Sequence, residues 1–249
     1  MFCSIKLKNN VYQCYYETYG SKEKEPLVLL HGWGVDSSIF SNIISQLDYY
    51  VVVLDFLGFG KSDTPLIPLT LEDYVNQVSQ VIEKLNLKNI TLLGHSFGGR
   101  IAIKYNYYYN LSKLILVDSA GIKRFNYKLK KKIIKYKLLK KYYYIFSKKK
   151  YQKLIETSGS RDYKILTPIM KQTMNKVINV DLRKYCKKTR TKTLILWGVN
   201  DQETPLQDGY TFYKCFYRSR IILFYKSGHF PSLDEKDKFI RIINGVKDD

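Results

Sequence analysis

Ser96 is the residue whose surroundings most clearly predict chemistry. It lies in Gly94-His95-Ser96-Phe97-Gly98-Gly99, between the apolar run Ile90–Leu93 and a helix-like segment, Arg100–Tyr109. A G-x-S-x-G sequence between a strand and a helix forms a sharp turn that lifts the serine hydroxyl above the edge of the sheet. Glycines are needed on both sides because a Cβ would clash in so tight a turn. The sequence therefore predicts a nucleophilic serine.

Three histidines could supply the base that a serine hydroxyl needs within hydrogen-bond reach. His229 follows the last predicted strand, in Ser227–Phe230, and is free to reach across the top of the sheet, so we interpret it as the base. His95 directly precedes the serine, and the turn directs it away from the nucleophile. We expect His31 and His95 to have structural roles and to hold loop backbone by hydrogen bonds.

A carboxylate must orient the base and stabilise its charged form. Asp201 fits this role best, because it lies just past the predicted strand Thr193–Leu196 in a loop at the same edge of the sheet. Asp118, which follows an earlier strand, remains open as an alternative acid. We interpret Glu203 and Asp208 as charges at a helix N-terminus.

Backbone amides near Ser96 could stabilise the oxyanion that forms when a serine attacks a carbonyl group. The amide of Phe97 lies at the start of the predicted helix, where the helix dipole also helps. The second donor is expected in His31–Gly34, where the amide of Trp33 can turn inward because glycines flank it.

Apolar runs alternate with helical patterns along most of the chain. The runs are continuously apolar, as in strands that are covered on both faces, and they are Leu27–Leu30, Tyr50–Leu54, Ile90–Leu93, Leu114–Val117, Thr193–Leu196 and Ile221–Phe224. Helices are predicted at Leu71–Leu85, where Thr70 and Asp73 resemble a capping box, and at Arg100–Tyr109, Leu206–Phe216 and Glu235–Gly245. This alternation predicts an α/β fold with a doubly wound, mainly parallel sheet. Ser4–Leu7 and Val11–Thr18 are expected to form an antiparallel hairpin.

Residues 121–189 interrupt the alternation and predict a helical lid, inserted into a core formed by residues 1–120 and 190–249. One apolar stripe at helical spacing, expected to pack on the core, is Leu129, Ile133, Tyr136, Leu139, Tyr143 and Phe146. A second stripe, which either lines the substrate cavity or is buried in the lid, is Ile134, Leu138, Tyr142 and Ile145.

The formal charge of +20 is concentrated in this insertion. Residues 123–190 hold 23 Lys or Arg and 3 acidic residues, whereas the rest of the chain holds 19 of each sign. We favour compositional drift at solvated positions as the explanation. The alternative is a cationic face, with weak association of the basic lid with an anionic membrane surface or an acidic ligand. Specific nucleic-acid binding is not expected, because the segment shows no recognised nucleic-acid motif.

Cysteine spacing and the apolar runs limit other functions. The four cysteines show no C-x-x-C spacing, which fits a reducing compartment and predicts no zinc site. No apolar run approaches the length of a membrane span, and the first residues lack a signal-peptide pattern. We therefore expect a cytoplasmic protein without a metal site.

Together these motifs resemble the α/β-hydrolase superfamily. The resemblance rests on Gly94–Gly99, His31–Gly34, Asp55–Ser62, Trp197–Asp201 and Gly228-His229, and it covers nearly the whole chain except the lid. The order Ser96, Asp201, His229 is the order of the catalytic residues in that family. Two further stretches resemble a group of small capped bacterial serine hydrolases, and they are Val117–Ile122 and Ser158–Tyr163.

The resemblance implies water-dependent cleavage of a small acyl substrate, without a cofactor. An ester or thioester hydrolase is the leading hypothesis, and a C–C bond hydrolase of ring-cleavage products is an alternative. A protein that keeps the fold but senses a ligand without turnover is the third. Epoxide hydrolases and haloalkane dehalogenases of this fold use an aspartate where this chain has Ser96, and the few acids in the lid argue against the amine substrates of proline iminopeptidases.

Overall fold

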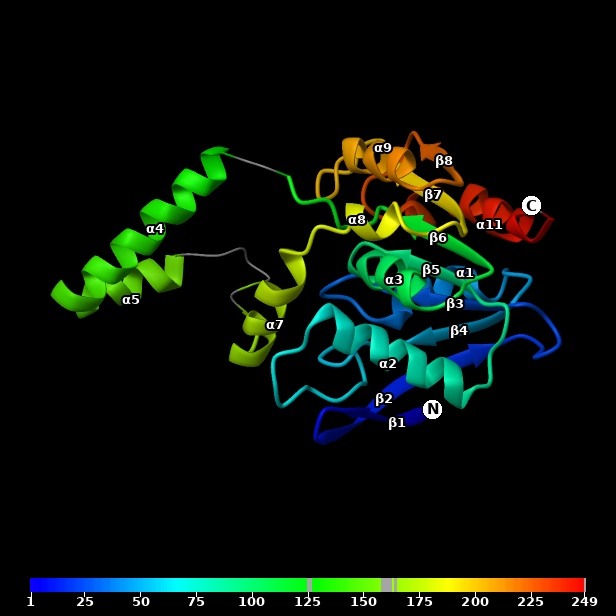
Figure 1. Cartoon of the computed structure of the whole chain (residues 1–249), viewed down its shortest axis with the longest axis horizontal. Coiled ribbons are helices and arrows are strands. Elements are labelled where there is room, and N and C mark those ends of the chain that lie inside the picture. Colours follow the sequence, from blue (N-terminus) through cyan, green and yellow to red (C-terminus); the bar gives the residue numbers. More distant parts are fainter. Residues whose placement is uncertain (125–126, 158–162, 164, 249) are drawn as a thin grey trace.

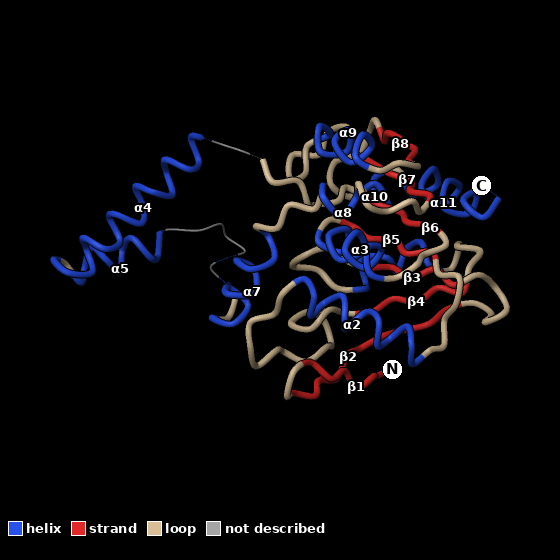
Figure 2. The backbone as a smooth tube through the Cα atoms, viewed as in Figure 1, coloured by secondary structure: helices blue, strands red, loops and turns tan. Residues whose placement is uncertain are grey.

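The computed structural model describes residues 1–124, 127–157, 163 and 165–248, and within them the chain forms one eight-stranded sheet flanked by helices (Figures 1 and 2). The strands are β1 (Phe2–Leu7), β2 (Asn10–Tyr19), β3 (Pro26–Leu30), β4 (Tyr50–Leu54), β5 (Thr91–His95), β6 (Lys113–Val117), β7 (Lys192–Gly198) and β8 (Ser219–Phe224). The helices are α1 (Ser41–Ile44), α2 (Leu71–Lys84), α3 (Phe97–Tyr108), α4 (Tyr127–Phe146), α5 (Lys148–Thr157), α7 (Pro168–Ile178), α8 (Arg183–Cys186), α9 (Leu206–Cys215), α10 (Pro231–Asp234) and α11 (Lys236–Gly245), with short 3-10 turns η1 (Ser37–Phe40) and η2 (Val246–Asp248).

The sheet order is β1-β2-β4-β3-β5-β6-β7-β8. The strands from β4 to β8 in this order pair in parallel, whereas β2 pairs antiparallel with both β1 and β4. The doubly wound, mainly parallel sheet predicted from the sequence is confirmed, and so is the N-terminal hairpin. The capping box of α2 is also confirmed, because the Thr70 side chain accepts from the Asp73 amide and the Asp73 carboxylate accepts from the Thr70 amide.

Two hydrophobic cores lie on opposite faces of the sheet, because successive side chains of a strand point in opposite directions. In β3, Val28 and Leu30 belong to the core under α2 and α3, whereas Leu27 and Leu29 belong to the core under α1 and α11. Burial on both faces explains why the strands are continuously apolar in sequence. The sheet is therefore held rigidly from both sides, and its carboxyl edge can carry a precisely positioned site.

The insertion after β6 consists of two unlike parts. Helix α7 lies against the core, where Met170 and Val177 are buried and the Thr173 hydroxyl accepts from the Leu69 amide at 3.0 Å. Arg100 of α3 secures the end of this helix by donating to the main-chain oxygens of Val177, Ile178 and Val180. Helices α4 and α5 instead form a hairpin that projects away from the core (Figure 1). Residues 158–162, part of the stretch that resembles capped hydrolases, lie outside the described residues.

The two apolar stripes predicted for the insertion do not pack as expected. The second stripe is exposed along α4, with Leu138 65% accessible, so the predictions that it lines a cavity or is buried in the lid are wrong. In the first stripe, Tyr136, Leu139 and Tyr143 are half-buried and Phe146 is exposed. The reason is topological, since α4 contacts α5 along one face and turns the opposite face to solvent.

The junction between β5 and α3 depends on glycines that let backbone segments touch. A Cβ on Gly94 would lie 2.5 Å from the main-chain oxygen of Gly98. A Cβ on Gly98 would overlap the main-chain oxygen of Leu30 and lie 2.7 Å from that of His31. The expectation that the turn around Ser96 excludes side chains at these glycines is confirmed. The close contact also fixes the loop after β3 against the first turn of α3.

We predict that Gly98→Ala destabilises the protein by about 3 kcal/mol, because backbone atoms on the far side of the contact cannot move aside as a flexible side chain could. Gly245→Ala at the end of α11 is the matched control, since a Cβ there meets nothing within 4 Å and alanine favours a helix. Urea unfolding followed by circular dichroism measures both variants. Equal stability of the two variants would contradict the steric argument.

Candidate active site

Ser96 occupies the turn between β5 and α3 in a left-handed conformation, with φ of 51° and ψ of −110°. This region is costly for a residue with a Cβ. Backbone hydrogen bonds hold it in place, because the Ser96 amide donates to the Val117 oxygen at 3.0 Å and the Ser96 oxygen accepts from the amides of Gly99 and Ala120. The side chain is half-buried. A strained serine that is fixed by its neighbours is the arrangement expected of a nucleophile at a strand–helix turn.

His229 and Asp201 come together although 28 residues separate them. His229 Nδ1 lies 2.8 Å from Asp201 Oδ2, and both side chains are buried. Asp201 also accepts from the amides of Glu203 and Thr204, and from the Thr204 hydroxyl at 2.6 Å. Burial alone would raise the pKa of Asp201, but the hydrogen bonds from His229 and Thr204 hold it below its ordinary value. Asp201 is therefore a charged carboxylate that fixes one nitrogen of the imidazole.

The other imidazole nitrogen of His229 faces a second carboxylate. His229 Nε2 lies 3.4 Å from Glu203 Oε2, whose side chain is 71% exposed. Among the described side chains, the structure records no hydrogen bond from the Ser96 hydroxyl to this nitrogen. Glu203 also precedes α9, which begins at Leu206, so the interpretation of Glu203 as a helix N-terminal charge is wrong. Asp208 does lie in the first turn of α9, where it pairs with Arg124 at 2.8 Å.

His95 connects the serine turn to the loop that carries His229. Its Nε2 lies 2.7 Å from the main-chain oxygen of His229, and the two rings are 4.8 Å apart. Burial, followed by the nearby His229, lowers the pKa of His95 to about 3. His95 is therefore neutral, so that its Nε2 carries the proton and donates it to the carbonyl group. The predicted structural role of His95 is confirmed.

His31 holds a second loop in a similar way. Its Nε2 accepts from the Phe56 amide at 3.0 Å, and its Nδ1 lies 2.7 Å from the Gly32 oxygen. Burial lowers the pKa of His31 to about 4, so this ring is neutral as well. The structural role predicted for His31 is confirmed.

The loop His31–Gly34 lies directly beside the serine. A Cβ on Gly32 would be 3.4 Å from Ser96 Cβ and 3.1 Å from His95 Nδ1. Trp33 packs edge-to-face on Phe97 at 5.1 Å and on Phe59 at 4.8 Å. The structure records no acceptor for the amides of Trp33 or Phe97 among the residues it describes. The oxyanion role of these two amides stays a prediction.

Asp118 lies beneath this site and differs in charge from Asp201. Its Oδ1 accepts from the Gly198 amide at 2.9 Å, and its Oδ2 is buried without a hydrogen-bond partner. Burial, opposed only by the bond from Gly198, raises the pKa of Asp118 to about 9. Asp118 is therefore protonated near neutral pH. Its main-chain oxygen accepts from the hydroxyl of Thr204 at 2.9 Å, so the peptide of Asp118 supports a residue that contacts Asp201.

Thr204 is a further residue of the site, one that was not predicted from the sequence. The signal was available, because an aspartate commonly accepts from amides two and three residues ahead in an Asx turn, and Asp201 is followed by Glu203 and Thr204. Within the described residues, no group of three or more His, Cys, Asp or Glu side chains is arranged to hold a metal ion.

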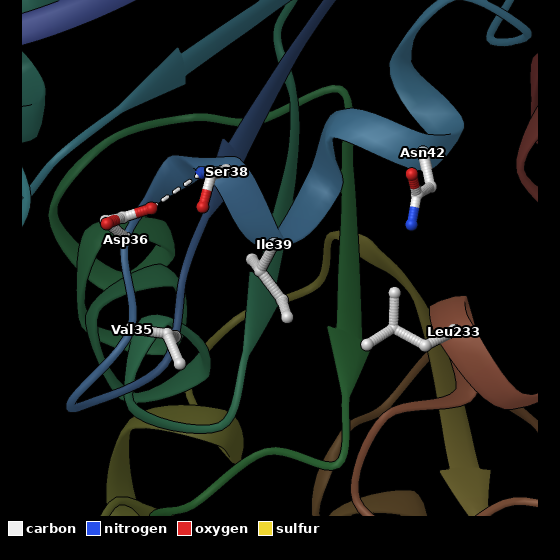
Figure 3. Close-up of a pocket in the computed structure, with 6 residues that line it drawn as sticks. All are labelled: Val35, Asp36, Ser38, Ile39, Asn42 and Leu233. Carbon is white, nitrogen blue, oxygen red and sulfur yellow. Dashed lines mark hydrogen bonds between the residues drawn. The ribbon is translucent and has the colours of Figure 1, made fainter.

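A surface pocket lies close to the His31–Gly34 loop but does not contain the reacting residues. Its lining is Val35, Asp36, Ser38, Ile39, Asn42 and Leu233 (Figure 3). Asp36 has a structural role there, since it caps η1 by accepting from the Ser38 amide at 2.9 Å. Because Ser96, Asp201 and His229 are not part of the lining, this pocket is not the candidate for the chemistry.

We predict that Asp118→Asn stabilises the protein increasingly as the pH rises. An unfolded aspartate loses its proton near pH 4, whereas folded Asp118 keeps it up to about pH 9. Between these values unfolding releases a proton, so wild-type stability falls by roughly 1 kcal/mol per pH unit. Asparagine cannot titrate and lacks this slope.

The difference in free energy of unfolding between Asp118→Asn and wild type is measured by urea titration at about pH 5, 6, 7 and 8. Other titrating groups cancel in the difference. The free energy of unfolding of the variant, relative to that of the wild type, should increase at each higher pH. A pH-independent difference would show that Asp118 is ionised in the folded protein.

Known proteins resemble this chain in both sequence and fold. Residues 25–132 match the sequence model of the alpha/beta hydrolase fold family. A serine hydrolase-like protein of Homo sapiens is 34% identical over 109 residues, which cover 41% of this chain and 54% of that protein. An AB hydrolase superfamily protein of Bacillus subtilis, YisY, is 26% identical over 245 residues, covering 88% of this chain and 90% of that protein.

Structural likeness extends over the full chain. An esterase from Exiguobacterium antarcticum superposes with a TM-score of 0.75 at 27% identity, and all of both chains is covered. The chain spans only 33% to 54% of the length of the first curated relatives it matches. The family match, this likeness and the sheet order agree with one another. The chain therefore has the alpha/beta hydrolase fold, and within residues 25–132 its sequence matches the model of that family.

Proposed function

We propose that the protein is a serine hydrolase that cleaves a small ester, thioester or related carbonyl compound through an acyl-enzyme. The observation that carries this proposal is the buried 2.8 Å contact between His229 and Asp201, on a loop that His95 ties to the turn bearing Ser96. The relatives named as a serine hydrolase-like protein and an esterase support the same class of reaction.

In this mechanism the Ser96 hydroxyl oxygen attacks the substrate carbonyl carbon while His229 Nε2 takes the hydroxyl proton. Asp201 holds the imidazole through Nδ1 and stabilises it while it is charged. When the tetrahedral intermediate collapses, the bond to the leaving group breaks and His229 gives its proton to that group. A water molecule then attacks the acyl-enzyme carbonyl carbon while His229 takes a proton from the water. His229 gives this proton to the Ser96 oxygen as the acyl bond breaks, so the acid is released and Ser96 is restored.

Glu203 must leave Nε2 before this nitrogen can accept a proton from Ser96. The side chain is mostly exposed and its contact with the ring is 3.4 Å long, so rotation into solvent costs little. Catalytic hydrogen bonds in ligand-free enzymes are often long or poorly aligned, and they tighten when substrate binds. Substrate binding is therefore expected to displace Glu203 and bring Ser96 and His229 into contact.

The amides of Trp33 and Phe97 are the donors expected for the oxyanion. Phe97 is the first residue of α3, so the positive end of the helix dipole adds to its amide. One such donor typically lowers the barrier by roughly 2.7–4 kcal/mol. The ring of Trp33 packs edge-to-face on those of Phe59 and Phe97, which fixes the Trp33 loop against the start of α3.

Ser96→Ala should abolish hydrolysis of p-nitrophenyl butyrate, because no other group supplies the nucleophile in this mechanism. Loss of roughly 10⁶-fold in kcat is the scale seen when such a serine is removed. A fluorophosphonate probe should label the wild type and fail to label the variant. Ser45→Ala, at an exposed position, is the control. If Ser96→Ala turned over as fast as the wild type, Ser96 would have no part in the mechanism. If the wild type hydrolysed a panel of esters and thioesters no faster than background, a non-catalytic sensor would be favoured.

A second prediction separates the two candidate acids. Asp201→Asn should lower kcat by about 10⁴-fold, because an amide favours the wrong imidazole tautomer. Asp118→Asn should have a far smaller effect, since Asp118 is already neutral and contacts the Gly198 amide rather than His229. The opposite ranking in a steady-state assay of both variants would assign the acid role to Asp118.

A further inference from the structure

The hairpin formed by α4 and α5 has a surface that the proposed chemistry does not use. It stands apart from the core, as Figures 1 and 2 show. Its two helices contain 12 lysines, no arginine and a single acidic residue, Glu156. A large share of the positive charge of the chain is therefore presented by one projecting element.

One face of α4 holds the hairpin together. Tyr136, Leu139 and Tyr143 of α4 are half-buried, as are Tyr151 and Leu154 of α5. Lys150 of α5 lies over the ring of Tyr143, with its Nζ 5.8 Å from the ring centroid. The contacts between the helices thus account for the half-buried apolar residues, and they leave the opposite face of α4 without a partner among the described residues.

That opposite face carries an exposed apolar stripe of Ile134, Leu138, Tyr142 and Ile145. These residues follow one another at steps of four, four and three, so they share one side of a helix with 3.6 residues per turn. Their exposed fractions lie between 49% and 65%. Contiguous apolar side chains on a surface commonly mark an interaction site.

Lysines border the stripe on both sides. By helical spacing Lys135 lies along one edge, and Lys137 and Lys141 lie along the other, and all three are exposed. Lys148, Lys149 and Lys150 add exposed charge at the start of α5. An exposed apolar stripe bordered by lysines suits the interface of a bilayer, where apolar side chains can lie below the headgroups and ammonium groups can reach the anionic phosphates.

We propose that the α4–α5 hairpin docks the protein on anionic lipid bilayers, with α4 parallel to the membrane plane. The stripe enters the interface and the bordering lysines pair with lipid phosphates. Within the part of the chain that the structure describes, none of the helices could span a bilayer. The hairpin follows β6, so it leaves the core from the carboxyl edge of the sheet, where Ser96 and Asp118 also lie.

Two other occupants fit the surface less well. A second copy of this chain would bring the same lysines face to face, at a cost in like-charge repulsion. A nucleic acid would pair with the lysines but would leave Ile134, Leu138 and Ile145 in water, and base recognition commonly uses arginine, which both helices lack. A bilayer is the partner that satisfies the charge and the apolar stripe together.

Sedimentation with vesicles tests the proposal. The wild type should bind vesicles of equal parts phosphatidylglycerol and phosphatidylcholine at low salt, and bind pure phosphatidylcholine far less. The triple variant Lys135→Glu, Lys137→Glu, Lys141→Glu should bind the anionic vesicles roughly 100-fold more weakly, since each lysine contributes about tenfold or less near such a surface. The matched control is Lys22→Glu, Lys88→Glu, Lys214→Glu, three exposed lysines of the core with the same change in net charge.

The apolar stripe is tested separately with Leu138→Gln and Ile145→Gln, two exposed positions where glutamine keeps the helix. This double variant should bind roughly tenfold more weakly at low salt, and its remaining binding should be more sensitive to salt than that of the wild type. Equal losses in the hairpin and core lysine triples would show that net charge alone acts, and would overturn the proposal. So would absent vesicle binding, or binding of a fluorescent oligothymidine that exceeds vesicle binding and is lost in the hairpin triple. Because vesicle binding requires no turnover, failure here leaves the role of Ser96 untouched.

Discussion

Direct packing of backbone on backbone around Ser96 is the constraint on which the site depends. Gly98 lies against the end of β3, and Gly32 lies against both His95 and Ser96. A side chain at either glycine would push the two backbone segments apart. The lack of a Cβ at these positions therefore sets the distance between Ser96 and the Trp33 loop. The left-handed turn at Ser96 persists because its amide donates to the Val117 oxygen and its own oxygen accepts from the amides of Gly99 and Ala120. The strain is thus balanced locally, within a sheet buried on both faces.

The two aspartates near this turn show how hydrogen-bond donors decide where a charge resides. The Asp201 carboxylate accepts hydrogen bonds from two amides, a threonine hydroxyl and an imidazole. These bonds offset the cost of burial and keep the carboxylate ionised. Asp118 is buried more deeply and receives one amide, so it retains its proton. Two neighbouring buried anions would repel each other, and neutralising Asp118 avoids that repulsion. A single negative charge then remains, and it lies against the imidazole.

The sequence was sufficient for elements whose determinants are local. Continuous apolar runs located the parallel strands because burial on both faces leaves no polar positions, and Thr70 with Asp73 marked the start of α2. Ser96 was recognisable because its turn requires glycines at fixed offsets. The contact of Glu203 with His229 could not be predicted, because it depends on how two loops from different strands meet. The packing of α4 was also not predictable, since both of its stripes are apolar and only the position of α5 decides which one is covered.

The positive charge of the chain is concentrated in the α4–α5 hairpin, away from the residues proposed to carry out the reaction. Residues outside 123–190 carry equal numbers of basic and acidic side chains, so the sheet and its carboxyl edge have no large net field to perturb a reaction. Helix α4 has 20 residues and is about 30 Å long, whereas exposed charges are screened over about 8 Å in physiological salt. Most lysines of the hairpin therefore act on whatever approaches the hairpin rather than on Ser96. A change in the charge of this hairpin therefore has little effect on the imidazole and carboxylate of the site, whereas it directly alters what the hairpin can bind.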